Sequence, residues 1–162
     1  MKKVRIFGVF LLVCLAPVFT ANILAETGNM TIQGSVPTSM SLTVPSSVQM
    51  PSLVPGTSVE SAAQTVTINT NTSNWTLTVA ETGGENDGYM AMSNYHKLTY
   101  PIQICGGDLT SFQSLGTSTL TIKSGGSGPA TISDIYFRQP VAVNETVGTY
   151  SIILMFTATA SN

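Results

Sequence analysis

The chain has 162 residues and few charged side chains, with six Lys and Arg against eight Asp and Glu and a formal net charge of −2. A chain of this length is expected to fold as one domain with a substantial buried core. So few basic residues give no attraction to a phosphate backbone, which excludes nucleic acid as a partner.

Residues 1–25 are predicted to be a secretory signal peptide. A basic start precedes an almost wholly apolar run from Ile6 to Val18, and cleavage is expected after Thr20 or Ala25. The apolar run is short for a bilayer span and has the flanks of a leader, although an uncleaved anchor is the alternative. After cleavage the charge is 3 − 8 = −5. The mature chain is expected to be secreted, extracellular and on the cell surface, with no membrane segment.

Alternating apolar and polar residues recur through residues 26–162, and no segment shows helical periodicity. The predicted strands, in chain order, are 30–33, 40–44, 59–68, 75–79, 89–92, 98–104, 120–122, 132–137 and 148–160. Three prolines between 45 and 55 predict irregular or edge structure there. The strands at 59–68 and 75–79 are expected to form a hairpin. The whole pattern predicts a single all-β domain, an antiparallel immunoglobulin-like sandwich of about seven to nine strands.

Trp75 is the only tryptophan, and it shares one face of its predicted strand with Leu77 and Val79. This spacing predicts an inward-facing core residue. The last strand places Tyr150 and Phe156 on one face, and Trp75 is expected to meet that face across the two sheets.

The opposite face of the last strand also contains apolar residues, Ile153 and Met155. This predicts that the middle of the strand is covered or lies centrally in its sheet. In the strand at 98–104, alternation assigns Tyr100 to the apolar face.

The sequence predicts no enzyme, no metal site and no cofactor. His96 is the only histidine, and no serine lies in a Gly-x-Ser-x-Gly turn. The acidic residues between Glu81 and Gly88 lack the spacing of a calcium loop and predict a solvated turn. Cys105 is the only cysteine after the leader, and a buried or half-buried thiol at a strand end is expected.

Two kinds of surface site remain as hypotheses. Tyr89 and Tyr95 are candidate sugar contacts beside the acidic loop. Four Asn-x-Ser/Thr triplets are candidate glycosylation sites in a secreted chain. Their acceptors are Asn29, Asn71, Asn74 and Asn144.

Two stretches resemble the WxL domains of prokaryotic cell surfaces: NWTLTV at 74–79 and GTYSIILMFT at 148–157. The motif residues are Trp75, Leu77, Val79, Gly148, Tyr150 and Phe156. The resemblance implies an exported, non-catalytic β-domain whose partners are a cell-envelope polymer or other surface proteins. Phe156 and Ala158 stand where that family has a second Trp and Leu. A WxL-like structural or adhesive module is the leading hypothesis.

The closing Gly-Thr-Tyr strand and the Thr-rich alternation are also similar to fimbrial subunits and spore-coat-U-like secreted pilins. This resemblance implies a pilus subunit that joins copies of itself in a filament by strand addition. The donated segment would be 26–36, ETGNMTIQGSV. The cysteine pair of those families is missing, and Ser161 replaces an aromatic penultimate residue. Strand donation and self-complementation both remain open, and a carbohydrate-binding module is the third hypothesis.

Overall fold

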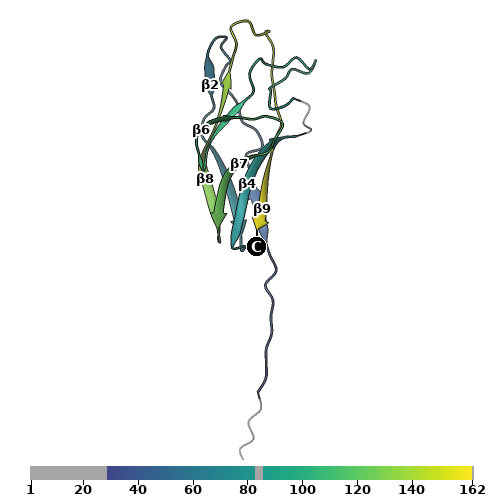
Figure 1. The fold of residues 1–162 in the computed structure, drawn as a ribbon, viewed down its shortest axis with the longest axis vertical. Coiled ribbons are helices and arrows are strands. Elements are labelled where there is room, and N and C mark those ends of the chain that lie inside the picture. Colours follow the sequence, from purple (N-terminus) through teal and green to yellow (C-terminus); the bar gives the residue numbers. More distant parts are fainter. Residues whose placement is uncertain (1–28, 83–85, 162) are drawn as a thin grey trace, which may run out of the picture. The chain divides into compact units, whose positions relative to one another are not determined.

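The computed structural model describes residues 29–82 and 86–161, so the predicted signal peptide lies outside the described residues. Contacts divide the chain into two units, 1–35 and 36–162. In the first unit, the described residues 29–35 form no strand. The second unit contains all the described strands (Figure 1).

Within the described residues, nine strands form two antiparallel sheets, which confirms the predicted all-β sandwich. The strands are β1 (Met40–Thr43), β2 (Ser58–Glu60), β3 (Gln64–Thr70), β4 (Asn74–Glu81), β5 (Gln103–Gly106), β6 (Leu109–Ser114), β7 (Leu120–Gly126), β8 (Ala130–Pro140) and β9 (Leu154–Ser161). The larger sheet has the order β1-β3-β8-β5-β6, with β2 also paired to β8, and the smaller sheet has the order β7-β4-β9. The described residues include no helix, and therefore none long and apolar enough to span a membrane.

Strand β4 shows how alternation builds this fold. Trp75, Leu77 and Val79 are at most 2% exposed, whereas Thr76 and Thr78 between them face outwards and are half-buried. On the outer face Thr76 lies opposite Thr159 of β9, and Thr78 lies opposite Thr157. Threonine is β-branched and therefore suits the pleated surface of a sheet. The hydroxyl groups of these threonines, rather than charged groups, make the outer face polar.

The fully buried core comes mostly from the inner strands of the two sheets. Its strand residues are Val66, Ile68, Trp75, Leu77, Val79, Ile104, Ile122, Ile132, Ile135 and Phe137. The indole of Trp75 reaches across to β7, where Gly125 is its cross-strand partner. A Cβ at Gly125 would lie 2.1 Å from Cζ2 of the ring, so the indole occupies the space that a side chain there would need.

The predicted hairpin between 59–68 and 75–79 is wrong. Strands β3 and β4 follow one another in sequence but belong to different sheets. The turn between them crosses the sandwich and is held by Thr72, which is 4% exposed and donates its hydroxyl to the Asn74 carbonyl at 3.0 Å. A strand with one apolar face can lie beside the next strand in the same sheet or face it from the opposite sheet. The alternation of apolar and polar residues is the same in both arrangements, so it does not distinguish them.

Two expectations about the last strand are also wrong. Trp75 does not meet it across the sandwich, because β9 is the neighbour of β4 in the same sheet and Trp75 pairs with Ala160. Strand β9 is an end strand, neither central nor covered. Ile153 and Met155 are accordingly 72% and 51% exposed.

Several predicted strands are shorter than expected or absent. The segment 30–33 forms no strand, 89–92 contributes only a bridge at Ala91, and 59–68 is divided between β2 and β3. The strand predicted at 98–104 begins at Gln103, after Pro101, and Tyr100 is 48% exposed, against the prediction that it faces the core. Strand β6 was not predicted from the sequence.

We expect Gly125→Ala to lower the free energy of unfolding by about 1–3 kcal/mol, because the buried indole has no free space into which to move. Gly126→Ala is the matched control. A Cβ at Gly126 would meet only the Ser73 carbonyl at 3.9 Å, so a change below about 1 kcal/mol is expected. Urea unfolding followed by Trp75 fluorescence measures both variants. Equal stability of the two would contradict the packing described for the indole.

Candidate functional site

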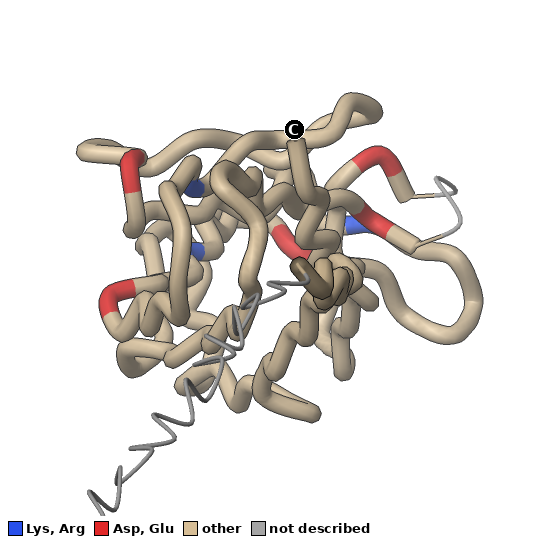
Figure 2. Tube along the Cα trace, turned by 90° about the horizontal axis from the view of Figure 1, so that it is seen from below, with Lys and Arg blue, Asp and Glu red and all other residues tan. Residues whose placement is uncertain are grey.

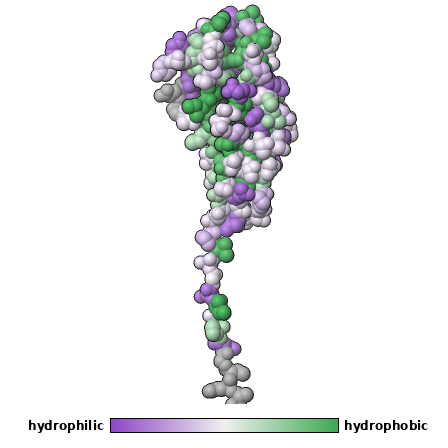
Figure 3. Space-filling model, turned by 180° about the vertical axis from the view of Figure 1, so that it is seen from behind, coloured by the Kyte–Doolittle hydropathy of each residue, from purple (hydrophilic) through white to green (hydrophobic). Residues whose placement is uncertain are grey.

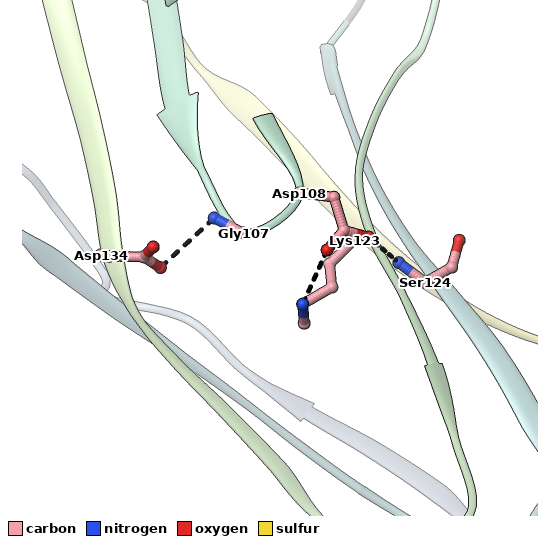
Figure 4. Close-up of polar contacts among 5 residues, drawn as sticks. All are labelled: Gly107, Asp108, Lys123, Ser124 and Asp134. Atoms are coloured by element: carbon pink, nitrogen blue, oxygen red, sulfur yellow. Dashed lines mark hydrogen bonds and ion pairs between the residues drawn. The ribbon is translucent and has the colours of Figure 1, made fainter. Parts of the chain in front are cut away.

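The two long sides of the sandwich differ in their hydrogen bonding, and on the β6–β7 side the turn between β5 and β6 is bonded to β7. Asp108, in the turn between β5 and β6, connects the larger sheet to β7 of the smaller sheet (Figure 4). Its backbone N–H donates to the Ile122 carbonyl at 2.8 Å. Its carboxylate accepts from Lys123 Nζ at 2.7 Å and from the Ser124 N–H at 2.9 Å. Hydrogen bonds of this one residue therefore join the two sheets at the β5–β6 turn.

Glycines allow the turn to approach both sheets. Gly106 and Gly107 have φ of +123° and +64°, which side chains disfavour. A Cβ at Gly107 would lie 2.8 Å from the Ile122 carbonyl oxygen. The Gly107 N–H donates to Asp134 Oδ1 at 3.3 Å, which ties the turn to β8 as well.

The opposite side, which we call the β1–β9 edge, has no such closure among the described residues. Strand β1 pairs only with β3, and β9 pairs only with β4, so each is the last strand of its sheet. The two strands approach one another across the sandwich. Neither MSLT of β1 nor LMFTATAS of β9 contains a charged residue or a proline. Charges and prolines are the usual means by which a free edge strand is kept from pairing.

The inward-facing side chains at the β1–β9 edge are only partly buried. Apart from Leu109, Leu120 and Ala130, every half-buried apolar residue that packs on the core belongs to 40–53 or 150–158. On the two edge strands these residues are Met40, Leu42, Leu154, Phe156 and Ala158. Their neighbours on β3 and β4, such as Ile68 and Leu77, are completely buried. The core is therefore complete in the middle of the sandwich and incomplete at this edge.

Residues 29–36 have the alternation of a strand. Met30 and Ile32 are 85% and 88% exposed, as is Val36 at 88%, and polar residues stand between them. Figure 3 shows hydrophobic (green) and hydrophilic (purple) residues following one another along the described N-terminal stretch. No turn occurs between Asn29 and Ser39. This segment was predicted as a first strand or a donated segment, and it carries exposed apolar side chains.

Charged residues are sparse in the described part of the chain and do not gather in one patch (Figure 2). Lys97 lies 3.9 Å from Asp87, and Arg138 lies 3.7 Å from Glu60. The described residues contain no group of three His, Cys, Asp or Glu that could hold a metal ion. The half-buried thiol of Cys105 donates to the Leu109 carbonyl at 3.2 Å, as expected for a strand-end cysteine.

The residues of the predicted family motif do not form one cluster. Trp75, Leu77 and Val79 lie in the core. Phe156 lies at the β1–β9 edge. Tyr150 is half-buried and donates its hydroxyl to the Thr146 carbonyl at 2.6 Å, and the nearby Gly148 is exposed. A Cβ at Gly148 would meet Met92 Sδ at 2.1 Å.

The two tyrosines proposed as sugar contacts differ in exposure. Tyr95 is 77% exposed, has a φ of +64° and lines a surface hollow with Met92 and Ser93. Tyr89 is half-buried. Tyr95 therefore presents its ring to solvent, whereas Tyr89 presents only part of its surface.

The four candidate glycan acceptors also occupy different settings. Asn29, Asn74 and Asn144 are exposed. Asn71 is exposed too, but both polar atoms of its side chain are hydrogen-bonded: Oδ1 accepts from the Ser39 N–H, and Nδ2 donates to the Pro37 carbonyl, both at 2.8 Å. The sequence indicated Asn71 only as part of a triplet, and no sequence signal predicted these bonds.

No protein-family model matches the chain, so the WxL resemblance gains no support, and no curated protein matches it. Among solved structures, the chain is similar to one of a chaperone–usher pilus. The match has a TM-score of 0.48 and 15% identity and covers 87% of this chain and 99% of that one. It is also similar to a chain of a chaperone–tip adhesin complex of CFA/I fimbriae, with a TM-score of 0.45, 15% identity and coverage of 76% and 42%. At this level neither likeness decides what this chain does.

The bridge at Asp108 predicts an acid-dependent loss of stability. The hydrogen bond from Lys123 and the bond from the Ser124 N–H lower the pKa of Asp108 below its ordinary value of 3.8. A lowered folded-state pKa stabilises the fold above the ordinary value, and the contribution is lost as the pH falls through the folded value. We expect Asp108→Asn to flatten the decline in melting temperature between about pH 5 and pH 2.

Glu145→Gln is the comparison variant. Burial raises the pKa of Glu145, but hydrogen bonds from Thr99 and Ala142 and the charge of His96 together lower it below its ordinary value, so part of the acid dependence belongs to Glu145. Each single variant should therefore remove part of the pH dependence and the double variant more. If the melting temperature of Asp108→Asn depends on pH as that of wild type does, the hydrogen bonds of Asp108 to Lys123 and Ser124 do not stabilise the fold.

Proposed function

We propose that this chain is a non-catalytic, extracellular structural subunit that joins other copies of itself by strand addition. In this assembly the segment 26–36 of one copy lies along the β1–β9 edge of another. Such addition combines backbone hydrogen bonds at a free sheet edge with side chains placed in the partner's core. The resulting polymer is a filament, because each subunit both gives and receives one segment.

The incomplete core at the β1–β9 edge is the observation that supports this proposal most strongly. Met40, Leu42 and Phe156 face inwards yet remain partly exposed, although they belong to the same apolar layer as buried residues. Removing such side chains from water stabilises a structure by about 25 cal/mol per Å² of apolar area. An added strand at this edge supplies the missing cover.

The N-terminal segment has the chemistry that this edge requires. Met30, Ile32 and Val36 recur at even positions, so one face of the extended segment is apolar and the other is polar. The eight residues 29–36 match the eight residues of β9, and each spans about 26 Å when extended at about 3.3 Å per residue. The one charged residue of the segment 26–36 is Glu26 at its start, and no charge occurs between 29 and 36, so pairing of residues 29–36 along an uncharged edge buries no ion.

We expect residues 37–162, without the segment, to remain folded and to bind a synthetic peptide of residues 26–36. Binding should raise the melting temperature in proportion to the logarithm of peptide concentration, because the peptide binds the folded state. The chain 26–162 should form filaments visible by electron microscopy. Thermal unfolding with a peptide titration and sedimentation of the longer chain measure the two effects.

Two peptide variants provide the control. Replacing Met30 and Ile32 by Ser removes the apolar face and should abolish binding, whereas replacing Thr31 and Gln33 by Ser alters only the opposite face and should preserve it. If the shortened chain ignores every peptide and the chain 26–162 stays monomeric, the proposed function is wrong.

A further inference from the structure

Four hydrogen bonds hold the residues to which the N-terminal segment is attached, and all four lie within the compact unit 36–162. Asn71 Oδ1 accepts from the Ser39 N–H at 2.8 Å, and Asn71 Nδ2 donates to the Pro37 carbonyl at 2.8 Å. The Ser39 carbonyl accepts from the Asn71 N–H at 3.2 Å and from Thr70 Oγ1 at 3.1 Å. We call Pro37–Ser39, held in this way by Thr70 and Asn71, the clamp.

The clamp lies where a self-inserting segment would have to turn. Strand β1 begins at Met40, opposite Thr70. Strand β9 ends at Ser161, opposite Asn74, so both edge strands meet the β3–β4 turn at the same end of the sandwich. To lie beside its own β1, the segment would have to reverse direction within the residues just before Met40. Those residues are the ones that the clamp holds.

The geometry of the clamp opposes such a reversal. A tight three-residue hairpin loop places a residue in the left-handed region, usually glycine. None of Pro37, Thr38 and Ser39 has a positive φ, and proline cannot adopt one. Forming the loop would also require the Pro37 and Ser39 backbone groups to leave Asn71. The two hydrogen bonds of the Asn71 side chain would have to be exchanged for bonds to water or within the new loop.

From this arrangement, and on the basis of the proposed function, we infer that Asn71 is a positioning residue. It holds the attachment point in a form that favours donation of the segment to a second copy over insertion into the subunit's own β1–β9 edge. Asn71 does not contact the donated strand. It acts by raising the free energy of the self-inserted monomer relative to the assembled form.

The test compares Asn71→Ala with wild type in the chain 26–162. We expect the fraction of monomer at a fixed protein concentration to rise about tenfold in the variant, because two hydrogen bonds that resist reversal are removed. Analytical ultracentrifugation measures this fraction. Asn69→Ala is the matched control, since Asn69 is an exposed asparagine of the same turn region, on β3, and should assemble as wild type does.

A second measurement separates positioning from a general loss of structure. Monomers of Asn71→Ala should not bind the peptide of residues 26–36, because their own segment occupies the edge. The same substitution in the chain 37–162 should leave peptide affinity within about twofold of wild type, because the clamp lies outside the edge.

The outcomes distinguish this inference from the proposed function. If wild-type 37–162 does not bind the peptide, the proposed function fails whatever Asn71 does. If wild-type 37–162 binds the peptide but Asn71→Ala assembles like wild type, only the inference about Asn71 is wrong. If Asn71→Ala also destroys peptide binding in the chain 37–162, Asn71 supports the fold rather than the direction of the segment, and the inference is again wrong.

Discussion

The end strands of a β-sandwich leave backbone N–H and C=O groups facing outwards, and each of these groups needs water or another strand as its partner. In this chain the constraint is met differently on the two sides. At β6–β7 the backbone and carboxylate of Asp108 bind β7 directly. At the β1–β9 edge the backbone of both strands is free on one side, and the apolar side chains beneath it are only half-buried. A single extended segment satisfies both needs at once, because a strand presents its backbone at its edges and its side chains on its faces.

The absence of charged residues from β1 and β9 agrees with the proposed strand addition. A lysine or glutamate on β1 or β9 would protect the edge from pairing, but its charge would have to be desolvated whenever a strand was added. Threonine avoids this difficulty. On the outer face, Thr157 and Thr159 of β9 keep the sheet hydrophilic through hydroxyl groups and favour extended backbone through their branched Cβ. One strand can therefore have a polar outer face and also an edge that is able to pair with another strand.

Alternation in the sequence predicts which side of a strand is buried but not which strand is its neighbour. It correctly places Trp75 and its two companions in the core, since burial of one face requires only a period of two. It gives a false hairpin for β3 and β4, because facing strands and paired strands have the same pattern. It also misjudges the last predicted strand, where Ile153, just before β9, and Met155 of β9 are apolar although they are 72% and 51% exposed.

The candidate site was harder to predict than the core for a related reason. Met40 and Leu42 have the spacing of core residues, and only the sheet order shows that their strand is the last one in its sheet. The clamp has no sequence signal at all, because the partners of Asn71 are backbone groups of Pro37 and Ser39, more than thirty residues earlier. Long-range bonds between a side chain and backbone groups leave no periodicity in the sequence.

An isolated strand is not stable in water, so strand-like alternation has a structural use only where another strand is available to pair. Residues 29–36 have this alternation, yet residues 29–35 form no strand within their own unit. The β1–β9 edge presents the converse situation, in which two uncharged strands and a partly exposed apolar layer lack a neighbour. Because the residues that join the segment to β1 are bonded to Asn71, the nearest edge in sequence is not the easiest one for the segment to reach. In the proposed assembly the segment instead reaches the equivalent edge of a second copy, and the inferred role of the bonds at Pro37–Ser39 is to favour that assembled form over the single chain.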